Sequence, residues 1–279
     1  MPIHDQGYRR YGGLKARAGT GWMVITRAGI RNQFAKRAFL GLLVMSWLPF
    51  FVRAVQVFAA ANLPQAQFLA ITAETFRQFL EQQQIWVFFI TVYVGAGLIA
   101  NDRRANALQI YLSKPLTRAE YIFGKLAILM SFLLLITWVP AIVLLIVQIS
   151  FAGNFTFLKN NFYLFPAITV FAFLQVTTVA AAMLALSSLS KSSRYVAILY
   201  AAVLFFTRAI YGVLSIVTRS TGLSWISFPA NLAQVGDVIF RLPPEYATPW
   251  PVSLLMIFGL IAVSALILER RVRGIEVVA

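Results

Sequence analysis

Long continuous blocks of apolar residues alternate with shorter polar segments along this chain. A helix needs about 20 residues to cross a hydrocarbon core of ~30 Å. The blocks therefore predict six membrane-spanning helices, at residues 38–60, 85–100, 126–150, 164–188, 195–217 and 250–268. Helices are expected rather than barrel strands, because the blocks do not alternate apolar with polar positions. Pro49 and Pro140 fall inside spans and predict kinks there.

The composition supports a membrane protein. The chain is 60% hydrophobic and 12% charged, whereas soluble domains have about 45–50% apolar and about 25% charged residues. We expect an all-α polytopic membrane protein, with a transmembrane domain at 38–268 between an N-terminal segment 1–37 and a tail 269–279. The chain has no cysteine and a single histidine, His4. We therefore expect no catalytic residue, no metal site and no cofactor in the membrane.

The basic residues behind the net charge of +15 are distributed unevenly between the predicted inner and outer segments. If the N-terminus is cytoplasmic, the inner segments hold 18 of the 24 Lys and Arg residues, and these segments are 1–37, 101–125, 189–194 and 269–279. The outer segments 61–84, 151–163 and 218–249 are of similar total length and hold four. This asymmetry is typical of the positive-inside rule, so both termini are predicted to be cytoplasmic. It also explains the basic charge without a nucleic-acid partner.

The inner segment after the second span has the pattern of a short amphipathic helix. An apolar stripe recurs there at helical spacing, formed by Ala105, Leu108, Tyr111 and Leu112. Asn101 or Asp102 is expected to cap its start, and Pro115 to stop it. Thr117 and Glu120 then match a capping box that begins the next helix. A short helix with one apolar side on the inner surface requires a partner, either lipid or a groove in another protein.

The run from Gly97 to Lys125 resembles the coupling-helix region of type-2 ABC transporter permeases. That family has an acidic residue at the end of the second span, followed by a Leu-Leu-Ser-x-Pro motif, an Arg, a Glu and a Gly-Lys pair. The matching residues here are Asp102, Leu112, Ser113, Pro115, Arg118, Glu120, Gly124 and Lys125. One departure is Ala105-Asn106-Ala107, where many members carry a Gly-Thr pair.

The resemblance extends beyond this loop. Residues 21–37 are similar to the interfacial elbow helix of these permeases, with Met23, Ile30 and Phe34 at helical spacing. The outer stretch 222–245 is too apolar for a free loop and too interrupted to span the membrane. The family carries re-entrant helices at this place, and an interfacial cover over a dimer is the alternative. Small residues in the fourth span, including Ser187 and Ser188, indicate close helix packing.

The resemblance implies the permease subunit of an exporter, which pairs with a second copy or a homologous permease and binds two cytoplasmic ABC ATPase subunits. The residues expected to couple to the ATPase are Asp102, Arg103, Arg104, Leu108, Tyr111, Leu112, Lys114, Pro115, Thr117 and Arg118. Leu108, Tyr111 and Leu112 would make the apolar contact. The alternative is a basic loop held in the cytoplasm by topology alone. No Walker A pattern surrounds Gly124-Lys125, so the chain is not expected to be an enzyme.

Two arginines, Arg53 and Arg208, lie in otherwise apolar spans and are candidate translocation-path residues. A charge at the bilayer centre costs about 2.5–3.5 kcal/mol on insertion scales. Both positions fall in the outer halves of their spans, so snorkelling to headgroups is one interpretation. A polar cavity or contact with an anionic substrate group is the other.

None of the six predicted spans contains Asp or Glu. Proton- or sodium-coupled transporters place acids at mid-membrane, so this absence favours an external energy source. The sequence therefore predicts the permease subunit of an ATP-driven transporter in the inner membrane. A non-transporting scaffold or assembly subunit is the alternative. Fold does not select the substrate.

Overall fold

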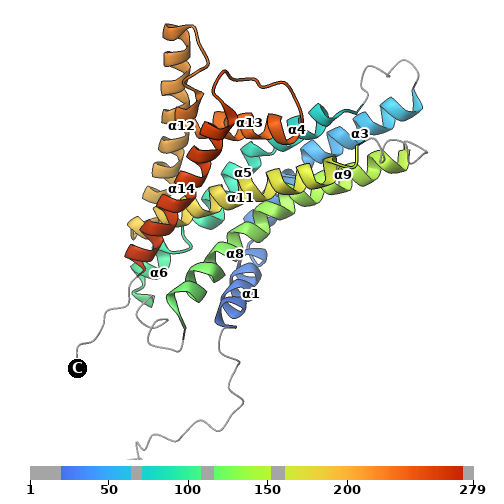
Figure 1. Ribbon diagram of the computed structural model, residues 1–279. Coiled ribbons are helices and arrows are strands. Elements are labelled where there is room, and N and C mark those ends of the chain that lie inside the picture. The colour runs from blue at the N-terminus through green and yellow to red at the C-terminus, as the bar shows by residue number, and fades with distance from the viewer. Residues whose placement is uncertain (1–19, 64–70, 108–115, 152–160, 273–279) are drawn as a thin grey trace, which may run out of the picture.

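The computed structural model describes residues 20–63, 71–107, 116–151 and 161–272. Within these ranges the chain is helical and contains no strand. Six helical runs are long and apolar enough to cross a membrane: Arg37–Asn62, Ala73–Arg104, Arg118–Phe151, Leu164–Leu189, Ser193–Thr218 and Trp250–Arg271. The expected all-α fold class with six membrane helices is confirmed (Figure 1).

The first and third runs are each interrupted near a proline. The first consists of α2 (Arg37–Met45) and α3 (Leu48–Asn62), and the third of α8 (Arg118–Ile136) and α9 (Trp138–Phe151). Pro49 and Pro140 lie in the first turns of α3 and α9, where a missing N–H is tolerated. The predicted disruptions are confirmed. At the interruption between α2 and α3, Gln83 Nε2 donates to the carbonyl oxygen of Ser46 at 3.3 Å.

The second run is longer than the expected span 85–100. It comprises α4 (Ala73–Gln82), α5 (Gln84–Ile90), a π-helical turn η2 (Thr91–Gly95) and α6 (Ala100–Arg104). The amphipathic α4 buries Phe76, Phe79 and Leu80. The longer run carries Glu74, Glu81 and Asp102 near its ends. The expected absence of acids therefore holds for 85–100 and not for the whole helical run.

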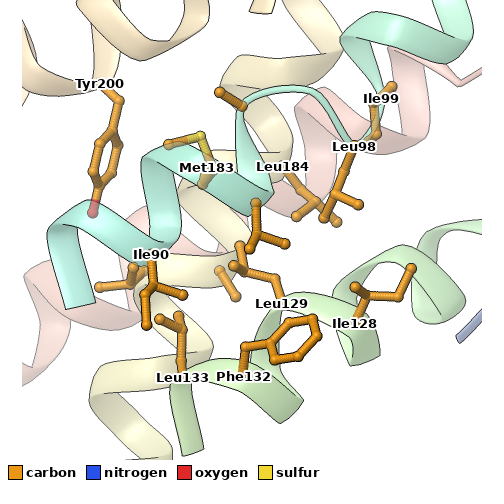
Figure 2. Close-up of a cluster of buried hydrophobic side chains, with 14 of the residues drawn as sticks. Ile90, Leu98, Ile99, Ile128, Leu129, Phe132, Leu133, Met183, Leu184 and Tyr200 are labelled. Carbon is orange, nitrogen blue, oxygen red and sulfur yellow. The ribbon is translucent and has the colours of Figure 1, made fainter. Parts of the chain in front are cut away.

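The main buried core lies where the second run meets α8 and α11 (Leu164–Leu189). Figure 2 shows Ile90, Leu129, Phe132 and Met183 converging there, and all four are almost fully buried. Gly95 permits this approach, because a Cβ atom at that position would lie 2.5 Å from Met183 Cγ. In a bilayer such close packing, rather than exclusion of water, stabilises helix association.

The C-terminal part of the chain differs greatly in burial. It contains α12 (Ser193–Thr218), a 3₁₀ turn η3 (Ser224–Ile226), α13 (Phe228–Ile239) and α14 (Trp250–Arg271). The short α13 is buried from Ala230 to Asp237, in the stretch where a re-entrant helix was expected. By contrast, α12 stands apart in Figure 1, and 11% of its most apolar stretch is buried, against 67% in α11.

Candidate functional site

In the sequence the segment 101–118 connects α6 to α8, and α6 and the start of α8 lie at the lower end of the bundle in Figure 1, as does α1 (Gly21–Phe34). Five of the ten expected coupling residues are described, and they are Asp102, Arg103, Arg104, Thr117 and Arg118. The other five, Leu108, Tyr111, Leu112, Lys114 and Pro115, lie outside the described residues. Arg104, Thr117 and Arg118 are exposed, so they are accessible at the two ends of this segment.

Asp102 links the two ends of the segment. Its Oδ2 atom lies 2.7 Å from Lys125 Nζ and accepts a hydrogen bond of 2.7 Å from the Tyr121 hydroxyl. Charge-assisted bonds of this length are the stronger class of hydrogen bond. Both partners lie on α8, so the carboxylate joins α6 directly to α8.

The local helix starts differ from the sequence interpretation in one place. The cap of α6 is Ile99, so the prediction that Asn101 or Asp102 caps it is wrong; Asp102 lies in the first turn instead. This helix ends at Arg104, and Asn106 adopts a left-handed conformation with φ of 52°. Asn tolerates that conformation better than most residues. A single continuous helix from Asn101 is therefore interrupted before Leu108.

The capping box at the start of α8 is confirmed. The Glu120 N–H donates to Thr117 Oγ1 at 3.2 Å, and the Thr117 N–H donates to Glu120 Oε2 at 2.8 Å. The second carboxylate oxygen of Glu120 accepts from the Gly21 N–H at 3.3 Å. Glu120 thus fixes the first turn of α8 and also holds the beginning of α1.

A glycine allows α1 to pack closely along α8. A Cβ atom on Gly124 would lie 3.0 Å from Ile25 Cβ and 3.1 Å from the Trp22 carbonyl oxygen. Thr26 Oγ1 lies 3.2 Å from the Gly124 carbonyl oxygen and donates to it. The packed face of α1 is therefore the Trp22 and Ile25 side, whereas Met23 is 53% exposed.

A cleft of about 570 Å³ opens between α1, the end of the second run and α8. Its polar lining includes Asn32, Lys36, Asn101 and the Asp102–Lys125 pair. The apolar wall is contributed by residues such as Ile128. The ion pair therefore borders an open cleft rather than a closed core.

The second run is broken between η2 and α6, and Ser187 of α11 fills the break. Its Oγ atom accepts from the N–H groups of Ile99 and Ala100 at 3.1 and 3.0 Å, and donates to the Ala96 carbonyl at 2.9 Å. The Arg103 guanidinium also donates to the Ser188 carbonyl. Sequence reasoning assigned Ser187 to packing only. The Gly-Ala-Gly sequence at 95–97 was the signal that could have indicated a break.

The two membrane arginines lie on different helices. Arg53, on α3, donates to the side-chain oxygens of three glutamines at 2.8–3.3 Å, and these are Gln56, Gln78 and Gln82. Arg208 is exposed on α12. No hydrogen bond or ion pair to Arg208 is found within the described part of the chain.

A buried ion pair that sequence reasoning missed joins α4 to α13. Arg77 Nε lies 3.1 Å from Asp237 Oδ1, and the Arg77 guanidinium stands over the Phe171 ring at 5.6 Å. Asp237 Oδ2 accepts from the Glu245 N–H at 3.2 Å. Burial raises the pKa of Asp237, and the Arg77 charge opposes that rise. Two single charges far apart in the sequence gave no local signal of this contact.

Comparison with known families identifies the family of this chain. A family model described as an ABC-2 family transporter protein matches residues 23–247, which is well over half of the chain. Comparison with curated proteins gives no match. The matched region runs from α1 through α13 and contains the 101–118 segment. Together with the six membrane-length helices, this match shows that the chain belongs to the ABC-2 transporter family and is a membrane-spanning permease subunit.

Proposed function

We propose that this permease subunit is part of an ATP-driven exporter in the inner membrane, with both termini in the cytoplasm. A separate cytoplasmic ATPase, present in two copies, supplies ATP hydrolysis. The distribution of Lys and Arg supports this orientation, because the segments assigned to the cytoplasm hold 18 of the 24. The export direction follows from the resemblance to type-2 permeases.

The Asp102–Lys125 ion pair carries the coupling proposal. It joins the helices on both sides of the 101–118 segment, and Glu120 and Gly124 attach α1 to the same helix. A displacement of the segment by an ATPase would therefore move α6, α8 and α1 together. In this proposal Leu108, Tyr111 and Leu112 contact the ATPase. The exposed Arg104 and Arg118 fix the register of the 101–118 segment on the ATPase surface.

The exposed surface of α12 supports a second permease copy. Phe205, Phe206, Val213 and Ile216 are all more than 60% exposed, and a Cβ atom on Gly212 would meet no atom within 4 Å. Arg208 lies on the same helix, and an arginine facing acyl chains is unfavourable. A partner copy, enclosing a polar path beside α12, would keep Arg208 away from lipid.

We assign Arg208 to this path as a candidate contact for anionic groups, whereas Arg53 lies on α3, away from α12, and faces the bilayer. Arg53 is held by neutral amides, and Arg208 forms no ion pair in the described residues. Both guanidinium groups therefore keep donors and charge that an anion can use.

The coupling proposal is tested by replacing Leu108, Tyr111 and Leu112 with Asp. We expect loss of the co-purifying ATPase, because three carboxylates cannot be buried unpaired in an apolar groove. The control is Lys191→Asp/Arg194→Asp, a charge change of similar size in another inner segment, which should retain the ATPase. Unchanged recovery from the triple variant would contradict coupling. A stable complex without ATPase stimulation in vesicles would instead favour a scaffold.

A further inference from the structure

Arg53 is the centre of a polar cluster between the exposed apolar surface of α3 and the exposed polar side of α4. Its guanidinium donates to Gln78 Oε1 and Gln82 Oε1, both at 3.3 Å, and to Gln56 Oε1 at 2.8 Å. The surrounding side chains are exposed and apolar, with Val52 at 69% and Val55 at 67%. A charge in such a setting needs a counter-charge or contact with headgroups.

The chain does not supply that counter-charge in its described residues. Glu81 pairs with Arg77 at 3.3 Å, and Glu74 borders the cluster by accepting from Gln78 Nε2 at 3.0 Å, but neither forms an ion pair with Arg53 among the described residues. The groups around Arg53 are neutral amides. Their oxygen atoms are occupied by Arg53, so the cluster still offers the positive charge of Arg53, the amide N–H groups of Gln82 and the second N–H of Gln78, whose first donates to Glu74. This chemistry is complementary to an anion.

The surface next to the cluster carries polar side chains at one end and apolar side chains at the other. Gln78, Gln82, Ile85 and Phe89 recur at helical spacing along α4 and α5, so they lie on one side of this helical run. The first two are polar and exposed, and the last two are apolar with exposures of 58% and 46%. At about 1.5 Å per residue, the polar and apolar ends of this stripe are ~16 Å apart. A polar head followed by an apolar strip matches one lipid molecule.

We propose that Arg53, Gln78 and Gln82 bind the phosphate of an anionic phospholipid, whose acyl chain lies along Ile85 and Phe89. The site goes beyond the transport proposal and requires only that the chain is embedded in a membrane. Loss of ATPase coupling would therefore leave it intact, and the absence of lipid binding would leave the coupling proposal standing.

The test uses the purified full chain in detergent, titrated with phosphatidylglycerol or phosphatidylcholine of identical acyl chains and followed by native mass spectrometry. We expect preferential retention of phosphatidylglycerol. Arg53→Gln should reduce its affinity about tenfold, because charge-assisted bonds to the phosphate are lost. The matched control is Arg219→Gln, which removes an exposed arginine at the end of α12 and should behave as the unaltered chain.

Two further variants keep the proposal testable if Arg53→Gln does not fold. Gln78→Ala/Gln82→Ala retains the charge but removes two amides, and Ile85→Gln alters only the apolar strip. Both should weaken phosphatidylglycerol binding. Equal retention in all the folded variants and the control would overturn the site. Displacement of the lipid by millimolar glycerol phosphate would overturn the lipid assignment, because it would show that a soluble anion suffices.

Discussion

Arg77 and Asp237 hold opposite charges almost out of contact with solvent, with side-chain exposures of 4% and 8%. Removing both charges from water is costly, and their attraction offsets that cost only while the pair is intact. The raised pKa of Asp237 reflects this balance, since burial outweighs the effect of Arg77. Gly236 belongs to the same arrangement, because a Cβ atom there would lie 2.7 Å from Arg77 Nε.

We predict that Arg77→Gln destabilises the protein by about 3 kcal/mol at neutral pH, because it leaves a buried carboxyl without its cation. The pKa of Asp237 is already raised in the folded state, and the substitution should raise it further. A folded-state acid with a raised pKa binds protons more tightly than in the unfolded chain. Stability therefore falls as the pH rises from the ordinary value through the raised one. As the pH rises from 4 to 8, the melting temperature of Arg77→Gln should fall over a wider pH interval than that of the unaltered chain.

The double variant Arg77→Gln/Asp237→Asn provides the matching comparison. It should recover part of the lost stability and remove the added pH dependence, because no buried charge remains. Glu81→Gln serves as a control, since Glu81 is 55% exposed and should matter by less than about 1 kcal/mol. An Arg77→Gln profile parallel to that of the unaltered chain would contradict the assignment.

At the scale of elements, the break in the second run is stabilised from outside the run. The backbone groups of Ala96, Ile99 and Ala100 all bond to one hydroxyl, that of Ser187. Buried backbone groups need such partners, most of all where no water can replace them. The conformation of η2 and α6 therefore depends on the position of α11.

We predict that Ser187→Ala lowers the unfolding free energy by about 2 kcal/mol, because it leaves buried backbone groups unpaired. The neighbouring Ser188→Ala is the control, since its hydroxyl bonds only to the Ala185 carbonyl of the same helix among the bonds described. Thermal denaturation in detergent compares the two. An equal loss in both variants would show that the hydroxyl does not stabilise the break.

At the scale of the whole molecule, α12 has the smallest buried fraction of the six membrane-length helical runs in the described chain. The absence of cysteine makes a direct test straightforward. Val213→Cys, 62% exposed on α12, should form a disulfide-linked dimer in native membranes if two copies meet there. Leu255→Cys, 69% exposed on α14, is the control and should remain monomeric. Dimers from Leu255→Cys alone would move the interface to α14.

Features encoded locally were predictable from the sequence. The six spans follow from apolar length, the helix breaks from Pro49 and Pro140, and the capping box from the spacing of Thr117 and Glu120. Contacts between distant segments were not predictable. Ser187 bonds to a carbonyl 91 residues away, and Arg77 and Asp237 meet through the packing of α4 against α13. Neither contact leaves a pattern of periodicity or spacing in the chain.

The paired interruptions at Ser46–Trp47 and Thr137 have a mechanical consequence. Beyond them, α3 and α9 pack against each other and run together to one side in Figure 1. Below them, hydrogen bonds and ion pairs bind α1, α6, α8 and α11 into one block. Helix α4 packs against both α3 and α9, and the first turns of α11 share a buried cluster with them that includes Phe76, Leu144 and Phe171. Bending at the two interruptions would therefore require α3 and α9 to carry α4 and the first turns of α11 with them.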